Sequence, residues 1–315
     1  MKIVFMGTPD FASGILKAIL ESEKHDVCAV VTAIDKPAGR GMQTMKSSVK
    51  QLAEKHQLTL LQPEKLKDPA FVECLESLHA DLFVVVAFRM LPEVVWKIPP
   101  KGTINLHASL LPHYRGAAPI NWAIINGETE TGVTTFFINE KIDEGNIILS
   151  EKTNILPDDN AGSLHDKLLH LGAKVLLNTL EQIENNTYKE QKQILSPHLK
   201  LAPKIFKKDC LINWNLTATA IHNLIRGLSP YPTAYTLFAD KNKHENIIKI
   251  FKSSTNLASH HLPPGLIETD NKQYLRIACK DGFIYVEELQ MSGKKRMDIK
   301  EFLLGNKLMY LTQCF

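Results

Sequence analysis

The sequence Gly102-Thr-Ile-Asn105-Leu-His107 is a short apolar run that ends on an amide and an imidazole. The run predicts a β-strand, in which residues two apart face the same side, so Asn105 and His107 would point into one pocket. A second β-rich run, residues 132–138, precedes Asp143, which could reach the same pocket from a neighbouring strand. An amide donor, an imidazole and a carboxylate are the groups that an acyl transfer to an amine requires.

The chain around this run alternates short apolar segments with helical patterns, which favours a parallel sheet with crossover helices. Strands are expected at residues 2–6, 26–32, 59–61, 82–87, 103–107 and 133–138, and helices at 11–21, 48–56, 70–79, 117–125 and 163–183. Only one glycine, Gly7, follows the first strand, so the glycine fingerprint of dinucleotide-binding proteins is missing. The N-terminal part is therefore predicted to be an α/β domain with a Rossmann-like, mostly parallel sheet.

A polar segment that contains Pro197 and Pro203 separates this pattern from a different one. Beyond it, one helix is expected at residues 218–226, followed by strands at 233–238, 247–251, 275–279 and 283–289, with hairpin turns at 240–243 and 280–282. A small all-β unit of about 100 residues fits a five-stranded, OB-like barrel of the kind that binds oligonucleotides. We therefore predict a catalytic domain (1–188), a linker (189–207) and a C-terminal domain (208–315).

Charge is distributed unevenly along the chain. Residues 1–199 hold 20 Lys and Arg against 24 Asp and Glu, a balance of −4, whereas residues 200–315 hold 17 against 10, a balance of +7, and together these give the net charge of +3. A basic C-terminal third suggests a polyanionic partner for that part of the chain. Chance clustering of solvated lysines explains the same charge equally well.

Composition predicts a cytoplasmic protein. The contents of 44% hydrophobic and 23% charged residues are those of an ordinary soluble chain, and the longest apolar run, residues 82–88, is too short to cross a bilayer. The five cysteines are scattered without any CxxC spacing, which argues for reduced thiols and against a zinc site or a disulfide framework. We expect a monomer with no metal and no membrane partner.

Asn105-x-His107, followed by Ser109-Leu-Leu-Pro112 and by Asp143-x-Gly145, resembles the formyltransferases that use 10-formyltetrahydrofolate. The resemblance runs along almost the whole chain and includes residues 1–11, 36–41, 114–120, 126–132 and 225–232. It implies the same two-domain fold, with an OB-like C-terminal domain. It also implies transfer of a formyl group from 10-formyltetrahydrofolate to the α-amino group of methionyl initiator tRNA, directly through a tetrahedral intermediate.

The resemblance assigns catalytic roles to Asn105, His107 and Asp143. Asn105 would donate to the formyl oxygen as it becomes an oxyanion, His107 would help to hold this intermediate, and Asp143 would orient His107. Spacing alone does not separate Asp143 from the adjacent Glu144; the resemblance selects Asp143. Without it, a buried structural histidine and turn-forming Asn and Asp residues would explain the same pattern.

The resemblance also assigns the folate-binding residues. Ser109, Leu110, Leu111 and Pro112 are expected to form one wall of the folate site, and the segment that contains Phe88 and Arg89 the other. The family usually has a glycine at the position of Arg89, so this chain is expected to differ from it in folate pose or affinity.

Five basic residues are candidate tRNA contacts: Arg40, Lys204, Lys207, Lys208 and Arg226. Arg40 lies in the Pro-Ala-Gly-Arg-Gly loop, which in the resembling family enters the acceptor end of the tRNA, and the other four are plausible phosphate contacts.

Three other functions fit parts of the pattern. A formyltransferase with a small acceptor, such as an amino sugar nucleotide or glycinamide ribonucleotide, would use the same chemistry, but the Pro-Ala-Gly-Arg-Gly loop and the basic C-terminal domain favour tRNA. A non-catalytic RNA-binding protein would not need Asn105, His107 and Asp143. A nicotinamide dehydrogenase would need the missing glycine fingerprint.

Overall fold

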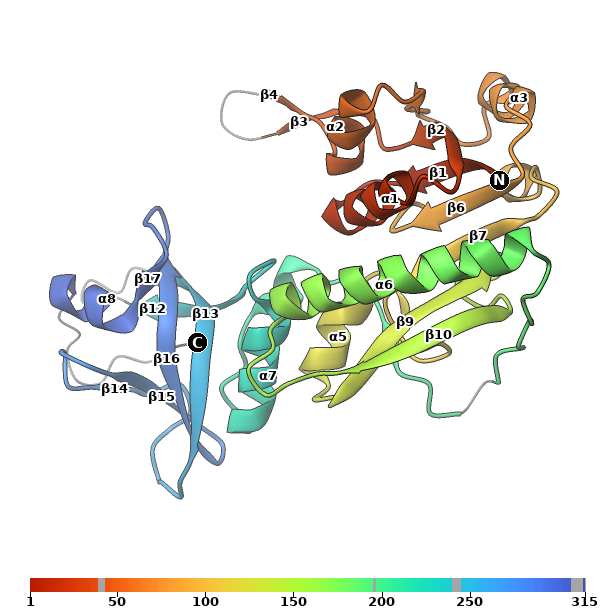
Figure 1. The fold of residues 1–315 in the computed structure, drawn as a ribbon. Helices are drawn as coiled ribbons and strands as arrows, with labels where there is room; N and C mark the ends of the chain where they lie inside the picture. The colour runs from red at the N-terminus through yellow and green to blue at the C-terminus, as the bar shows by residue number, and fades with distance from the viewer. Residues whose placement is uncertain (39–42, 195–196, 240–244, 307–313, 315) are drawn as a thin grey trace. The chain divides into compact units, whose positions relative to one another are not determined.

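The computed structural model describes residues 1–38, 43–194, 197–239, 245–306 and 314 (Figure 1). The chain forms two compact units, each of which draws on separate stretches of sequence. Unit 1 consists of Met1–Gly116, Thr131–Thr153 and His165–Leu201, and unit 2 of Ala117–Glu130, Asn154–Leu164 and Ala202–Phe315.

Unit 1 is built on a seven-stranded sheet with the strand order β10-β9-β7-β6-β1-β2-β5. The strands are β1 (Lys2–Gly7), β2 (Asp26–Val31), β5 (Leu60–Leu61), β6 (Leu82–Val86), β7 (Thr103–His107), β9 (Glu130–Phe137) and β10 (Ile147–Asn154). Pairing is parallel from β5 through β2, β1 and β6 to β7, and β9 lies antiparallel to β7. The predicted mostly parallel α/β sheet is therefore confirmed.

Strand β10 was not predicted. It lies at the edge of the sheet, and its residues alternate between covered and exposed positions. Its polar sequence, Ser-Glu-Lys-Thr-Asn after three apolar residues, lacks the continuous apolar run that marks β1 and β6, whose residues are buried on both faces.

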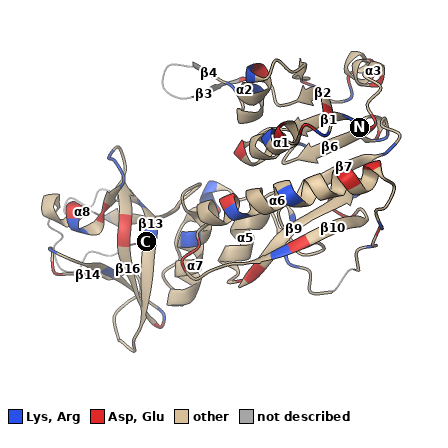
Figure 2. Ribbon diagram, viewed as in Figure 1, with Lys and Arg blue, Asp and Glu red and all other residues tan. Residues whose placement is uncertain are grey.

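The helices of the α/β layer are α1 (Asp10–Ser22), α2 (Ser48–Lys55), α3 (Pro69–Ser77), α4 (Glu93–Trp96) and α6 (Ala161–Glu184). Helix α6 runs beside α1, with the ring of His165 5.4 Å from that of Phe11, and charged residues of both signs lie along it (Figure 2). Its Gly172 lies so close to the sheet that a Cβ atom there would be 3.0 Å from Leu106 of β7. Helix α6 therefore covers the face of the sheet to which Leu106 points.

Four further strands are short: β3 (Lys36–Ala38), β4 (Gln43–Met45), β8 (Arg115–Gly116) and β11 (Leu201–Ala202). Strands β3 and β4 pair antiparallel and flank residues 39–42, so Arg40 lies outside the described residues.

Unit 2 contains an antiparallel sheet with the order β12-β13-β16-β15-β14, to which β17 adds beside β16. The strands are β12 (Ala234–Ala239), β13 (Glu245–Leu257), β14 (Ile267–Thr269), β15 (Leu275–Cys279), β16 (Gly282–Met291) and β17 (Met297–Asp298). This confirms the predicted all-β C-terminal sheet. The predicted turn at 280–282 joins β15 to β16, whereas the turn at 240–243 lies outside the described residues.

Helices α5 (Pro119–Ile125), α7 (Ala218–Leu228) and α8 (Ile299–Gly305) and the 3-10 helix η1 (Lys207–Cys210) also belong to unit 2. Helix α5 packs against α7, where the Asn121 side chain donates to the carbonyl of Gly227 over 2.8 Å. The core between α7 and the sheet is apolar and includes Ile221, Ile225 and Ile250. None of the helices in the described ranges is long and apolar enough to cross a bilayer.

Candidate active site

Asn105 and His107 project from the face of β7 opposite to α6. Leu106 packs towards α6, and alternate residues of a strand point to opposite faces. Asn105 is paired with Val85 of β6 and Phe136 of β9, so β7 is hydrogen-bonded on both sides. The two side chains are thus held on one surface in the middle of the sheet.

The ring of His107 is fixed by one hydrogen bond. Its Nε2 atom lies 2.8 Å from the carbonyl oxygen of Tyr114, and the side chain is 7% exposed. Because a carbonyl oxygen only accepts, Nε2 must carry the proton in this contact. The neutral imidazole then has its lone pair on Nδ1, which makes Nδ1 the atom able to take a proton.

The carbonyl oxygen of the Asn105 side chain is buried and has no hydrogen-bond partner among the described residues. A buried polar atom without a partner costs about 1–3 kcal/mol, so a polar group of a ligand would be stabilised here. Rotation of the amide by 180° would present its NH₂ donors at the same position. The site therefore fits a hydrogen-bond donor of a ligand with the amide as it stands, and a carbonyl group with the amide rotated.

Asp143 and Glu144 have different partners. The carboxylate of Asp143 accepts from the backbone N–H of Gly116 over 2.9 Å, whereas that of Glu144 forms ion pairs with Arg115 at 3.0 Å and Lys141 at 3.8 Å. The structure thus brings Asp143 and His107 to the same short segment, residues 114–116, and no direct bond between the two is found in the described part of the chain.

Three residues with positive φ angles follow the three neighbouring strands of the site. Ala87 (φ 46°) follows β6, Tyr114 (φ 59°) lies beyond β7, and Asp143 (φ 55°) lies beyond β9. Such backbone conformations cost on the order of 1–3 kcal/mol each outside glycine and gather at functional sites. Two of them, Tyr114 and Asp143, meet at the site, because Asp143 accepts from the backbone N–H of Gly116, two residues after Tyr114.

Within the predicted folate loop, two side chains are used to hold the loop itself. Ser109 is fully buried and donates to the carbonyl of His113 over 2.7 Å, while its own carbonyl accepts from Thr134 over 2.7 Å. Leu111 is also buried, whereas Leu110 and Pro112 are half-buried. Apolar surface in this loop therefore comes from Leu110 and Pro112.

Phe88 and Arg89 lie on the segment after β6. Phe88 is half-buried, and the guanidinium of Arg89 lies 5.6 Å from the centroid of its ring. Arg89 donates to the backbone carbonyls of Pro63 and Glu64, the latter over 2.8 Å. The positive φ angle of this segment falls on Ala87 and not on Arg89, so the backbone at residue 89 does not require a glycine.

The candidate tRNA contacts in unit 2 fall into two groups. Lys204, Lys207 and Lys208 are exposed at and before η1. Arg226 instead donates to Asn223 and to the carbonyl of Asp159, at 2.9 and 3.1 Å, and burial lowers its pKa. Its guanidinium is thus engaged within unit 2.

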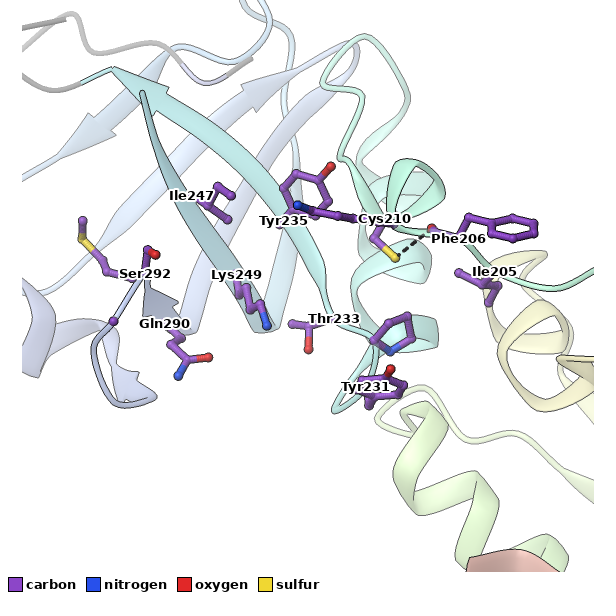
Figure 3. Close-up of a pocket in the computed structure, with 14 residues that line it drawn as sticks. Ile205, Phe206, Cys210, Tyr231, Thr233, Tyr235, Ile247, Lys249, Gln290 and Ser292 are labelled. Carbon is purple, nitrogen blue, oxygen red and sulfur yellow. Dashed lines mark hydrogen bonds between the residues drawn. The ribbon is translucent and has the colours of Figure 1, made fainter. Parts of the chain in front are cut away.

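A groove of about 550 Å³ lies beside these lysines (Figure 3). Its lining residues include Tyr231 (82% exposed), Phe206 (55% exposed), Lys207 and Lys249. Lys249 forms no ion pair with any residue in the described ranges. Sequence reasoning missed Tyr231 and Lys249, because the groove joins β12, β13, β16 and η1, which are separated along the chain.

No group of three or more His, Cys, Asp and Glu residues suited to a metal ion occurs in the part of the chain that the structure describes.

Two family models match the chain. The formyl transferase model matches residues 1–180, and the model of the formyl transferase C-terminal domain matches residues 204–307. The chain belongs to the formyl transferase family. The resemblance read from residues 105–145 is therefore confirmed at the level of the family.

Relatives match over nearly the full length. The methionyl-tRNA formyltransferase of Bacteroides fragilis is 49% identical over 100% of this chain and 97% of its own. That of Flavobacterium johnsoniae is 51% identical, over 97% and 96%. Among solved structures, an N-formyltransferase from Helicobacter canadensis in complex with folinic acid and dTDP-3-aminofucose shares the fold, with a TM-score of 0.63 and 22% identity, over 94% of this chain and 100% of that chain.

The glycine two residues after Asp143 provides a test of the loop that carries this carboxylate. A Cβ atom at Gly145 would overlap the carbonyl oxygen of Phe137, a backbone atom of the sheet that cannot move aside. We expect Gly145→Ala to destabilise the protein by roughly 2–3 kcal/mol. Gly305→Ala is the matched control, because no atom lies within 4 Å of a Cβ at Gly305. Chemical denaturation measures both; equal stability of the two variants would contradict the packing described here.

Proposed function

We propose that this protein transfers the formyl group of 10-formyltetrahydrofolate to the α-amino group of methionyl initiator tRNA, in the cytoplasm and as a monomer. The observation that carries the chemistry is that one face of β7 presents two groups: an Asn105 amide whose buried Oδ1 has no partner among the described residues, and a His107 ring whose Nδ1 holds the lone pair. The tRNA acceptor is supported by relatives about half identical to the whole chain whose names specify methionyl-tRNA.

The attacking amine needs little activation. An α-amino group has a reference pKa of roughly 7.7–8.0, and esterification of the neighbouring carboxyl lowers it further, so much of the amine is neutral at pH 7. As its bond to the formyl carbon forms, the amine must lose a proton and the formyl oxygen gains negative charge. Asn105 donates an amide N–H to this oxygen. Nδ1 of His107 takes the proton and returns it to the nitrogen that leaves.

Asp143 acts on His107 through the segment between them. Its carboxylate holds the N–H of Gly116, and the carbonyl of Tyr114, two residues earlier, holds Nε2 of His107. The arrangement keeps the proton on Nε2 and leaves the lone pair on Nδ1.

10-Formyltetrahydrofolate supplies the formyl group as a co-substrate. Its site is lined by the half-buried Leu110 and Pro112 on one side and Phe88 on the other. Ser109 and Leu111 hold the loop in shape, and Arg89 braces the opposite segment against the carbonyls of Pro63 and Glu64.

The tRNA is bound by the C-terminal domain, residues 208–315, with its linker, 189–207. Lys204, Lys207 and Lys208 supply phosphate contacts, and the adjoining groove adds Lys249 and the exposed Tyr231, a combination suited to RNA. Arg226 has its guanidinium engaged within unit 2 and contributes less. Arg40 is proposed as a contact to the acceptor end.

Formyl transfer from 10-formyltetrahydrofolate tests the function directly, with methionyl initiator tRNA, methionyl elongator tRNA, free methionine and a dTDP-amino sugar as rival acceptors. We expect rapid formylation of the charged initiator and transfer at least about tenfold slower to the others, because an acceptor that leaves polar contacts unmade loses transition-state binding. Preference for the amino sugar, or no transfer at all, would overturn the proposal.

The roles of Asn105 and His107 predict distinct losses. Asn105→Ala should lower kcat by about 10²–10³, the usual effect of removing an oxyanion donor. His107→Ala should lower it by about 10²–10⁴, the range of general acid–base catalysis. The Kd for methionyl-tRNA, measured by filter binding, should stay within about threefold, since neither residue is a phosphate contact. Retention of normal kcat by either variant removes that residue from the mechanism.

The lysines of η1 predict a change in salt dependence. In Lys207→Ala/Lys208→Ala, the slope of log affinity for tRNA against log salt should fall by about one to two, since each phosphate contact contributes about 0.7–0.9. Lys300→Ala, an exposed lysine on α8, is the matched control and should leave the slope unchanged. An unaltered slope in the double variant would show that these lysines do not contact tRNA.

A further inference from the structure

The polar segment after α6 docks on the loop that carries Asp143. Residues 188–193, here called the docked segment, begin one residue before the expected linker, 189–207. Gln191 and Ile147 exchange two backbone hydrogen bonds of 2.8 Å, so the segment pairs antiparallel with the first residue of β10. Nearby, the ring of Tyr188 lies 5.5 Å from that of Phe137, at the end of β9. The docked segment therefore holds both ends of the loop between β9 and β10.

Gln193 turns its side chain into this loop and is 8% exposed. Its Nε2 donates to the backbone carbonyls of Asp143 and Gly145, over 2.9 and 2.8 Å. Its Oε1 accepts from the guanidinium of Arg115 over 2.6 Å. The two N–H groups and the oxygen of the buried Gln193 amide thus form hydrogen bonds to three different residues.

Arg115 connects these contacts to the imidazole. It is 7% exposed, pairs with Glu144, and stands between Tyr114, which holds His107, and Gly116, which holds Asp143. Gln193 therefore fixes both partners of the Gly116–Asp143 hydrogen bond: the loop on one side and the segment 114–116 on the other.

We infer that Gln193 is a positioning residue for formyl transfer, which sets the Asp143 carboxylate against the segment that orients His107. This inference rests on the proposed function, in which His107 moves the proton. The positive φ angle of Asp143 makes the loop costly to hold, and the two hydrogen bonds from Gln193 stabilise it in that conformation.

The chemistry of the contacts requires an amide at this position. A carboxylate of the same shape would set an oxygen against two carbonyl oxygens, and an apolar side chain of the same length would leave those carbonyls and the Arg115 guanidinium without their partner. Gln193→Glu and Gln193→Met therefore remove the interaction in different ways while conserving volume. Gln191→Met is the matched control, because the Gln191 side chain is exposed on the same segment.

The first measurement is amide hydrogen exchange, which needs no substrate. Gln193→Met should raise exchange at residues 139–147 by at least about tenfold while amides of β1 and β6 exchange as before, because only the loop is released. Gln191→Met should change neither. Gln193→Asn, which shortens the side chain by one carbon, provides a milder variant if Gln193→Met does not fold.

The second measurement is steady-state formylation. Gln193→Met should lower kcat by about 10–10² with KM for both substrates within about threefold, since displacement of a reacting constellation by about 1 Å costs up to about 10². In an Asp143→Asn background the same substitution should cost little more, because both changes act through one carboxylate. A merely structural role would give full additivity with Asp143→Asn.

The results separate the two proposals. If the unaltered chain formylates no methionyl-tRNA, the proposed function is overturned. If it does, and Gln193→Met leaves loop exchange or kcat unchanged, or adds in full to Asp143→Asn, the positioning role of Gln193 is overturned and the proposed function stands.

Discussion

Strand β7 constrains everything else in the site, because it is paired on both sides and packed on one face. Val85 and Phe136 fix its register beside Asn105, and Leu106 is buried against α6. A shift of one residue would move Leu106 to the site and turn Asn105 and His107 into the apolar layer under α6, where their polar groups would lack partners. Sheet packing, and not any contact between the two polar side chains, therefore keeps them together.

Hydrogen bonds between polar groups around this strand further fix the positions of His107 and Asp143. The segment 114–116 holds His107 at one end and Asp143 at the other, and it is itself anchored through Arg115 to Gln193. His107, Arg115 and Gln193 are buried, and Gly116 and Asp143 are half-buried, which makes these hydrogen bonds costly to leave unmade. The positive φ angle of Asp143 lies in the loop whose carbonyls accept from Gln193.

How far the sequence predicts this arrangement depends on how far apart along the chain the interacting residues lie. Strands buried on both faces, such as β1 and β6, are evident as apolar runs, and the facing of Asn105 and His107 follows from the period of a strand. Strand β10, exposed along one face, gives no such run. Gln193 gives no signal at all, because its contacts join residues some 50 to 80 positions away, and a polar segment reads locally as a linker. The groove in unit 2 was not predicted for the same reason, since its lining residues are also far apart along the chain.

The same network decides which of two adjacent carboxylates can serve the chemistry. The carboxylate of Glu144 pairs with Arg115 and Lys141, and these two cations compensate its negative charge. Asp143 is held instead by a backbone N–H and forms no ion pair with any residue that the structure describes. Asp143 is therefore free of cations among the described residues, and through Gly116 it fixes the segment whose Tyr114 carbonyl holds the His107 ring. On the proposed mechanism, the two adjacent carboxylates have different roles. The ion pairs of Glu144 anchor the loop, and Glu144 does not compete with His107 for the proton.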